Sequence, residues 1–85
     1  MKLTLKYFAS LRETLGAGEA LAWTPEGEPT AGALRAWLCT RSDAHAQALA
    51  PGRAVRVAVD QALAADATPL RDGAEVAFFP PVTGG

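Results

Sequence analysis

The sequence has few of the residues from which catalytic or metal sites are built. Its single cysteine, Cys39, excludes an internal disulfide and a cysteine-based zinc cage. Because Cys39 follows Trp37 and Leu38 in a helical pattern, we interpret it as a structural thiol and not as a nucleophile. The single histidine, His45, lies in an alanine-rich polar stretch, where we expect a surface residue without a catalytic role.

The short motifs of phosphate, dinucleotide and zinc hydrolase sites are also missing. The sequence contains no G-x-x-x-x-G-K, no G-x-G-x-x-G after a strand and no H-E-x-x-H. Asp60, Asp66 and Asp72 are interpreted as turn residues, since aspartate side chains bond turn amides and no spacing here indicates an acid and base pair. We therefore expect no metal site, no bound cofactor and no enzymatic activity of the chain on its own.

Strong charge and long apolar runs are absent as well. The formal net charge of -1 gives no reason to expect nucleic acid or an anionic membrane as partner. The first stretch, "MKLTLKYF", alternates polar and apolar residues, so it predicts neither a signal peptide nor a membrane span. Together with the single cysteine, this pattern favours a cytoplasmic protein.

What the sequence does contain indicates one small α+β domain. A chain of 85 residues can build a single core. Thr30 predicts the start of the main helix, and Ser10, with Glu13 three residues later, predicts a capped short helix that Gly16 ends. Residues 44–49 are a further helical candidate. Hydrophobic alternation predicts strands at 2–8, 19–23, 54–60, 62–64 and 75–79. We expect the domain to span 1–81, with an extended tail at 82–85.

The same alternation leaves apolar side chains on the sheet surface away from the main helix. If Leu3, Leu5 and Tyr7 face the core, then Lys6 and Phe8 face outward. The outward residues of the strands at 54–60 and 75–79 are Arg56, Ala58, Ala77 and Phe79. Clustered exposed aromatics are typical of a partner site, here with Lys6 and Arg56 as a basic rim. Alternatively, a register slip or a covering loop buries Phe8 and Phe79.

The last stretch, "FFPPVTGG", is unusual for a packed domain. Pro80 and Pro81 remove backbone donors, which ends strand pairing and projects the chain in an extended form. The segment Val82 to Gly85 adds a reach of up to roughly 13 to 14 Å. Glycines let a backbone enter a channel too narrow for side chains, where an ATP-dependent partner could convert the Gly85 carboxylate into an acyl-adenylate. Alternatively, the segment is a disordered end or an artificial extension.

Four stretches together resemble one known family across nearly the whole chain. They are "LKYFASLRETLG", "PTAGALRAWL", "VAVDQALA" and, most specifically, "PLRDGAEVAFFPPVTGG". These stretches are similar to the ubiquitin-related β-grasp sulfur carriers, in particular to the small subunit of molybdopterin synthase. The resemblance implies a ubiquitin-like β-grasp fold with a mixed sheet of about five strands on one main helix and a flexible Gly-Gly tail. Asp60 replaces a common family asparagine, and Gly32 weakens the helix start.

The resemblance also implies a mechanism and its partners. Gly85 would be adenylated with ATP by an enzyme resembling the ubiquitin-activating family, and then converted to a thiocarboxylate by a sulfur donor protein. A large catalytic subunit, in a heterotetramer, would use this sulfur to convert cyclic pyranopterin monophosphate into molybdopterin. The tail residues that would thread into that subunit are Pro80, Pro81, Val82, Thr83 and Gly84. The residues implied or expected at the partner interface are Lys6, Phe8, Arg56, Leu63 and Phe79.

Three other functions stay open at this point. A thiamin-type sulfur carrier has a similar fold and ending, but is usually shorter and lacks the double phenylalanine and double proline. A ubiquitin-like modifier would instead form an isopeptide between Gly85 and target lysines. A plain interaction module would make no use of the tail.

Overall fold

The computed structural model describes residues 1–81. The elements in chain order are β1 Lys2–Tyr7, α1 Ala9–Leu15, β2 Gly18–Ala22, α2 Ala31–Leu38, α3 Asp43–Ala48, β3 Arg56–Val59, β4 Ala62–Ala64 and β5 Glu75–Phe79. The expected strands and helices are therefore confirmed, with shifts of one or two residues at several ends. Within residues 1–81, no helix reaches the length and hydrophobicity that crossing a membrane requires.

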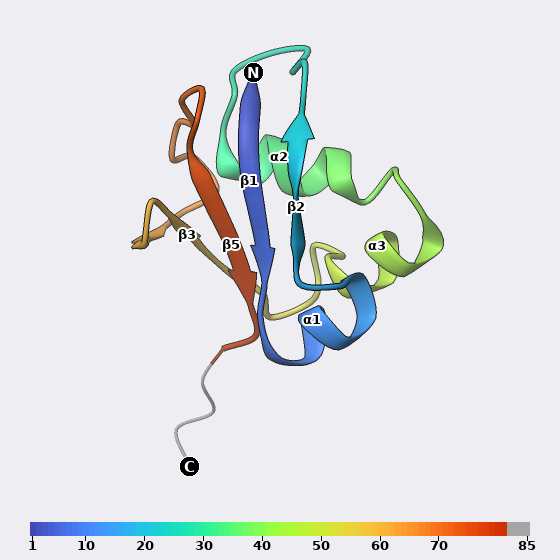
Figure 1. Ribbon diagram of the computed structural model, residues 1–85. Coiled ribbons are helices and arrows are strands. Elements are labelled where there is room, and N and C mark those ends of the chain that lie inside the picture. The colour runs from blue at the N-terminus through green and yellow to red at the C-terminus, as the bar shows by residue number, and fades with distance from the viewer. Residues whose placement is uncertain (82–85) are drawn as a thin grey trace.

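The strands form one mixed sheet whose middle strand is the last one in the chain. The order is β2-β1-β5-β3-β4, so β5 pairs on both of its edges. Its pairing with β1 is parallel and aligns Tyr7 with Phe78, whereas its pairing with β3 is antiparallel and aligns Val57 with Phe78. Figure 1 shows β5 between β1 and β3, with α2 crossing behind β1 and β2 and with α1 and α3 at the lower right.

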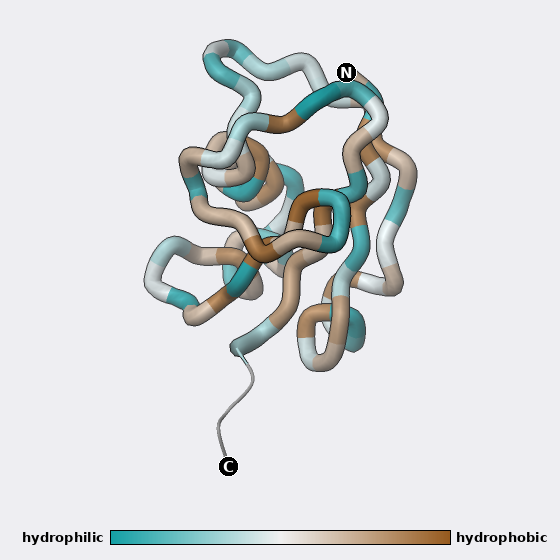
Figure 2. The backbone as a smooth tube through the Cα atoms, turned by 90° about the vertical axis from the view of Figure 1, so that its left-hand side faces the viewer, coloured by the Kyte–Doolittle hydropathy of each residue, from teal (hydrophilic) through white to brown (hydrophobic). Residues whose placement is uncertain are grey.

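One face of the sheet packs against α2, as the hydrophobic pattern predicts. Thr30 caps the helix by accepting a hydrogen bond from the amide of Ala33 at 3.1 Å. Leu34 and Leu38 are fully buried, and Trp37 is half-buried at the edge of the same face. The core cluster contains Leu3, Leu5, Tyr7, Leu11, Leu21, Trp23, Ala31, Leu34, Leu38, Leu49, Val57, Leu70, Ala74, Val76 and Phe78. Figure 2 shows hydrophobic colours along the strands and helices and hydrophilic colours in many of the turns.

The predicted start of α1 is wrong. Its N-cap residue is Phe8, which makes no side-chain cap, and not Ser10. The amide of Phe8 donates to the carbonyl of Phe78 at 3.1 Å, while the carbonyl of Phe8 accepts from Leu11 at 3.2 Å. Sheet pairing therefore holds the chain up to Phe8, and Ala9, with a φ of 53°, turns it directly into the helix. The predicted stop at Gly16 is confirmed, since this residue is the C-cap with a φ of 91°.

Two connections depend on close backbone approaches. A Cβ at Gly32 would lie 2.9 Å from the Cβ of Asp66, so only glycine lets the two segments meet here without displacement. The amide of Gly32 donates to the carbonyl of Asp66 at 2.9 Å, which ties α2 to the segment before β5. Between β3 and β4, Asp60 and Gln61 both have positive φ, and an Asp60 side-chain oxygen accepts from the amide of Glu75 at 2.9 Å.

Candidate functional site

The candidate site is the sheet surface turned away from α2, which we call the outer face. Strand pairing aligns Lys6 with Ala77 and Ala77 with Ala58, and Ala58 is in turn aligned with Leu63. These four residues form a row across four strands. The adjacent row toward the end of β5 contains Phe79, which is aligned with Arg56. Four of the residues assigned to a partner interface thus lie on neighbouring strands in register, namely Lys6, Arg56, Leu63 and Phe79, and the fifth, Phe8, directly follows β1.

The outer face exposes large apolar side chains. Phe8 is 45% exposed and Leu63 is 69% exposed, and these are the exposed large hydrophobic residues within 1–81. Phe79 is only half-buried, so the expectation of a solvent-facing Phe79 is confirmed in part. The aromatic Phe8 is not covered by a loop, which removes the alternative interpretation for that residue.

Ala77 lies on the outer face but is only 7% exposed, although we expected it to face solvent. It does not belong to the core cluster, so its burial does not come from the helix side of the sheet. The reason is its place in the middle strand, where neighbouring strands flank a methyl side chain on both sides. Ala77 therefore forms a flat floor between the larger outer-face residues.

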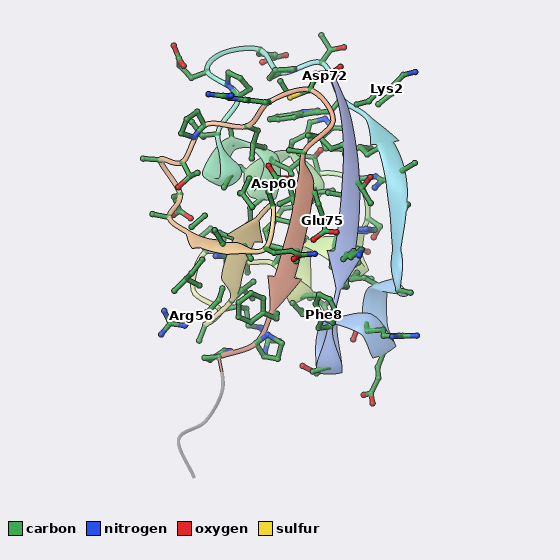
Figure 3. The ribbon with its side chains drawn as sticks, turned by 60° about the vertical axis from the view of Figure 1, so that its left-hand side comes forward. Lys2, Phe8, Arg56, Asp60, Asp72 and Glu75 are labelled. Carbon is green, nitrogen blue, oxygen red and sulfur yellow. The ribbon has the colours of Figure 1, made fainter. Side chains whose placement is uncertain are left out.

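The expected basic rim is half neutralised. The Lys6 ammonium lies 2.9 Å from a Glu75 carboxylate oxygen, and both side chains remain partly exposed. Among residues 1–81, Arg56 makes no ion pair and is exposed. Figure 3 shows Phe8 and Arg56 on either side of the end of β5, with Glu75 farther up the same strand. The free positive charge on this face therefore lies next to the point where β5 ends.

The two prolines stand at that point. β5 ends at Phe79, which confirms that the ladder stops before Pro80 and Pro81. Both prolines are half-buried, and Pro81 borders a hollow of about 180 Å³ together with Arg56 and Asp66. The residues expected to carry the reaction, Val82, Thr83, Gly84 and Gly85, lie outside the described residues.

The chemistry available within residues 1–81 is limited. In this range, no group of three or more His, Cys, Asp or Glu side chains is placed to hold a metal ion. Cys39 is half-buried, and its thiol lies 3.4 Å from the carbonyl oxygen of Leu49, which agrees with a structural role. The outer face therefore offers exposed apolar area and one positive charge, unpaired within the described residues, beside the end of β5.

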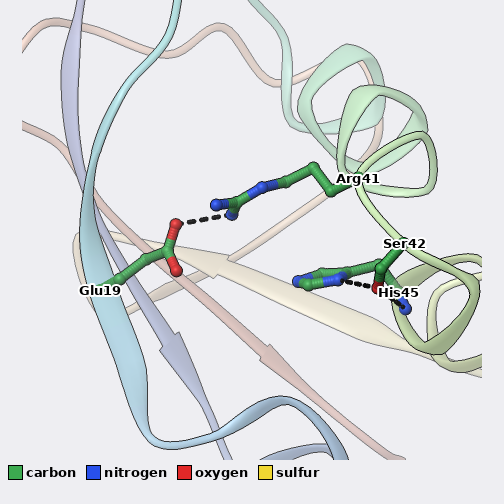
Figure 4. A network of polar contacts seen from close by, with 4 residues as sticks. All are labelled: Glu19, Arg41, Ser42 and His45. Atoms are coloured by element: carbon green, nitrogen blue, oxygen red, sulfur yellow. Dashed lines mark hydrogen bonds and ion pairs between the residues drawn. The ribbon is translucent and has the colours of Figure 1, made fainter.

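A polar network behind the sheet was missed by sequence reasoning. Arg41 forms an ion pair with Glu19 at 2.5 Å and lies over the Trp37 ring, 5.5 Å from its centroid. The Ser42 hydroxyl contacts Nδ1 of His45 at 2.7 Å, and it also accepts from the His45 amide. Figure 4 shows this network between β2 and the segment that joins α2 to α3. Ser42 and His45 are three residues apart, and the preference of serine for helix N-caps could have indicated their contact. Glu19 is 22 residues from Arg41 in the sequence, so no local signal could have paired these two.

The network borders a buried phenol. Tyr7 is 2% exposed and stacks on Phe78, and its hydroxyl has no hydrogen-bond partner within residues 1–81. Burial, and then the negative charge of Glu19, raise the pKa of Tyr7 to about 12. Burial, and then the positive charge of Arg41, lower the pKa of His45 below its ordinary value. Both shifts disfavour the charged form of the side chain.

Known proteins are similar to this chain in sequence and in fold. The ThiS family model matches residues 5–85. The molybdopterin synthase sulfur carrier subunit of Escherichia coli is 47% identical over 81 residues, which cover 93% of this chain and 94% of that protein. SAMP1 from Haloferax volcanii superimposes with a TM-score of 0.78 and 25% identity over the full length of both chains.

A more distant structure shows the same fold. A chain in the complex of subunits 1 and 2 of molybdopterin-converting factor from Helicobacter pylori gives a TM-score of 0.67 at 23% identity, again over the full length of both chains. The architecture is therefore the ubiquitin-like β-grasp that the sequence resemblance implied. The chain belongs to the ThiS family and is a homologue of molybdopterin synthase sulfur carrier subunits.

Proposed function

We propose that this protein is the sulfur carrier subunit of a molybdopterin synthase. The observation that carries the proposal is the 47% identity to the Escherichia coli sulfur carrier subunit, which extends over more than nine-tenths of both chains. The family match also runs through Gly84 and Gly85, the residues to which the proposal assigns the chemistry.

The proposed reaction takes place on the carboxylate of Gly85. A carboxylate oxygen attacks the α-phosphorus of ATP and expels pyrophosphate, which yields a glycyl-adenylate on the activating enzyme. Sulfide (HS⁻) delivered by a donor protein then attacks the acyl carbon, forms the C–S bond and expels AMP, and loss of the S–H proton leaves a thiocarboxylate. In the synthase, this sulfur would bond to a side-chain carbon of cyclic pyranopterin monophosphate and displace the oxygen held there, and water would then cleave the resulting thioester, leaving the sulfur on the pterin and releasing the Gly85 carboxylate. Two such transfers supply the two sulfurs of the dithiolene.

The chain contributes positioning and not catalytic side chains to this sequence. Pro80 and Pro81 end β5 at its central place in the sheet, so the segment that follows starts from a rigid base. Val82, Thr83 and Gly84 would thread that segment into the active site of the large subunit. Because Gly84 and Gly85 have no side chain, the channel can be narrow enough to exclude bulk water from the reacting carbon.

The outer face is the proposed docking surface for the large subunit. Phe8 and Leu63 offer exposed apolar area, Phe79 lies beside the base of the tail, and Arg56 provides an unpaired positive charge. Exposed apolar side chains bordered by charge suit a partner interface. The name of the Escherichia coli relative is that of a subunit, which supports a partner chain; we extend this to a heterotetramer with one carrier at each end of a large-subunit dimer.

A protein modifier is the second candidate. It is favoured by the similarity to SAMP1, since a closely related Haloferax volcanii structure is described as small archaeal modifier protein 1. In that function, the Gly85 carboxylate would be transferred to lysine amines of target proteins. A thiamin-type carrier would use the same thiocarboxylate with a different acceptor.

Intact-mass spectrometry of the protein isolated from its native host separates these functions. We expect a fraction of the molecules to carry sulfur in place of one oxygen at Gly85. A variant lacking Gly85 should lose sulfur transfer to cyclic pyranopterin monophosphate while it still binds the large subunit, and Thr14→Ala, an exposed position on α1, serves as a control with the carboxylate in place. Conjugates that increase in steps of the protein's mass, without a thiocarboxylate, would support the modifier, and transfer that persists without Gly85 would refute the carrier.

A further inference from the structure

A second surface hollow lies on the helix side of the molecule. The connection between β2 and α2, residues 23–30, borders a groove of about 560 Å³ beside α2. Ala33, Ala36 and Trp37 line it from the helix, and Trp23, which is 4% exposed, lines it from the end of β2. The groove exists because the helix presents alanines here, and the connection, "TPEGEP", has no large apolar side chain to cover them.

The groove is framed by fixed backbone. At one end of the connection, the amide of Trp23 donates to the carbonyl of Met1 at 2.9 Å. At the other end, the carbonyl of Pro29 accepts from the amide of Leu70 at 2.6 Å. The two tryptophan rings are in contact, with their centroids 6.3 Å apart. A groove that is held open in this way binds without a large cost of ordering its walls.

The rim of the groove carries unbalanced negative charge. Glu26 and Glu28 both line it, both are exposed, and neither carboxylate forms an ion pair within residues 1–81. Arg41, whose guanidinium lies 5.5 Å from the centroid of the Trp37 ring, is already paired with Glu19. An apolar floor with aromatic walls and two carboxylates complements a lysine or arginine side chain, whose aliphatic stem packs on the floor while its charged head meets the rim.

The groove lies at the opposite end of the fold from the base of the tail. In the sheet, Ala22 at the end of β2 is aligned with Lys2 at the start of β1, while β5 runs parallel to β1 and ends beyond Tyr7. Figure 1 shows the β2–α2 connection at the end marked N, away from the end of β5. A partner in the groove would therefore leave the outer face and the tail free.

We propose that this groove, lined by Trp23, Glu26, Glu28, Ala36 and Trp37, docks a basic segment of a second protein, with alternating lysine or arginine and apolar residues. The segment binds independently of the partner at the outer face. The carrier can then be held by one protein through the groove while another acts on its tail.

The proposal is tested by titrating the ¹⁵N-labelled full chain with an acetylated hexapeptide of alternating lysine and leucine. We expect saturable shifts of the indole resonances of Trp23 and Trp37 and of amides 24–40, with the outer face unchanged. A hexapeptide of alternating glutamate and leucine should cause no such shifts. Raising the salt concentration to about 1 M should weaken binding, since it reduces the Debye length to about 3 Å.

Substitutions at the groove test whether the peptide binds there. The pair Glu26→Gln with Glu28→Gln should weaken binding roughly three- to thirty-fold, as two exposed ion pairs would. The pair Glu13→Gln with Asp43→Asn has the same net charge and should bind like the parent. Ala36→Leu should fill the groove and abolish binding while circular dichroism stays unchanged. The proposal would be overturned if the peptide did not bind, or if both pairs of charge variants lost the same amount of affinity. It would also be overturned by resonance shifts centred on Phe8 and Leu63, or by a dimer formed through the groove in ultracentrifugation.

Discussion

The hydroxyl of Tyr7 is buried without a hydrogen-bond partner in the described part of the chain. Such a group has lost its bonds to water and regained none, which costs about 1 to 3 kcal/mol. We therefore expect Tyr7→Phe to keep the stacking on Phe78 and to raise the free energy of unfolding by about 1 kcal/mol, measured by urea denaturation at neutral pH. A loss of stability of similar size would mean that the hydroxyl has a partner in solution.

The same substitution has a pH signature. Because the pKa of Tyr7 is raised from 10.0 to about 12 in the fold, the unfolded chain releases this proton first as the pH rises. The contribution of the protonated Tyr7 hydroxyl to the free energy of unfolding is complete below pH 10, and it is lost as the pH increases toward 12. Denaturation between these limits should show a steeper loss of stability for the parent than for Tyr7→Phe.

His45 produces the opposite dependence. Its pKa is lowered from 6.5 by burial and then by Arg41, so the unfolded chain binds a proton more readily than the folded one. The contribution of neutral His45 to the free energy of unfolding is complete above the pKa of histidine in the unfolded chain. It is lost as the pH falls below that pKa. We expect His45→Gln to flatten the stability profile between about pH 7 and pH 5, and equal slopes in both proteins would contradict this assignment.

At the scale of the elements, the contact between α2 and the segment before β5 depends on one missing Cβ. Replacing glycine by alanine in a helix normally gains about 1 kcal/mol. At Gly32 the new methyl would meet Asp66 at 2.9 Å, so we expect Gly32→Ala to lower the free energy of unfolding by about 1 to 2 kcal/mol instead. Gly27→Ala is the matched control, because nothing lies within 4 Å of the place that its methyl would take, and it should be neutral.

Elements with a strong local signal were predictable. The alternation in β1 identified Leu3, Leu5 and Tyr7 as core residues, and Thr30 was correctly identified as the cap of α2. The start of α1 was not predictable, because the pairing of Phe8 with Phe78 overrides the local preference of Ser10 for a cap. The candidate site was predictable to a similar extent. Alternation predicts which residues face away from α2, but the burial of Ala77 depends on β5 being the middle strand, which alternation does not reveal.

For the molecule as a whole, the outer face can be tested apart from the fold. Leu63 is 69% exposed, so Leu63→Asp should change the free energy of unfolding by less than about 0.5 kcal/mol. It should weaken binding to the large synthase subunit by about ten-fold or more, as measured by calorimetry, because the leucine offers apolar area to the partner. Ala62→Asp places the same charge on the opposite face of β4 and should bind normally.

Phe79 gives a second test of the same surface. It is half-buried beside the base of the tail, so Phe79→Asp should weaken the same interaction at a modest cost in stability. Unfolding of this variant would show that Phe79 belongs to the core. Normal binding by both Leu63→Asp and Phe79→Asp would place the docking surface elsewhere on the molecule.

The parallel pairing of β1 with β5 has a mechanical consequence. Because the two strands run in the same direction, tension between the start of β1 and the end of β5 acts along both strands and in opposite senses. The hydrogen bonds that join them are then sheared together, and none can open ahead of the others as in the unzipping of a hairpin. A protein that pulls on the end of β5 while the start of β1 is held therefore meets all the hydrogen bonds between β1 and β5 at once.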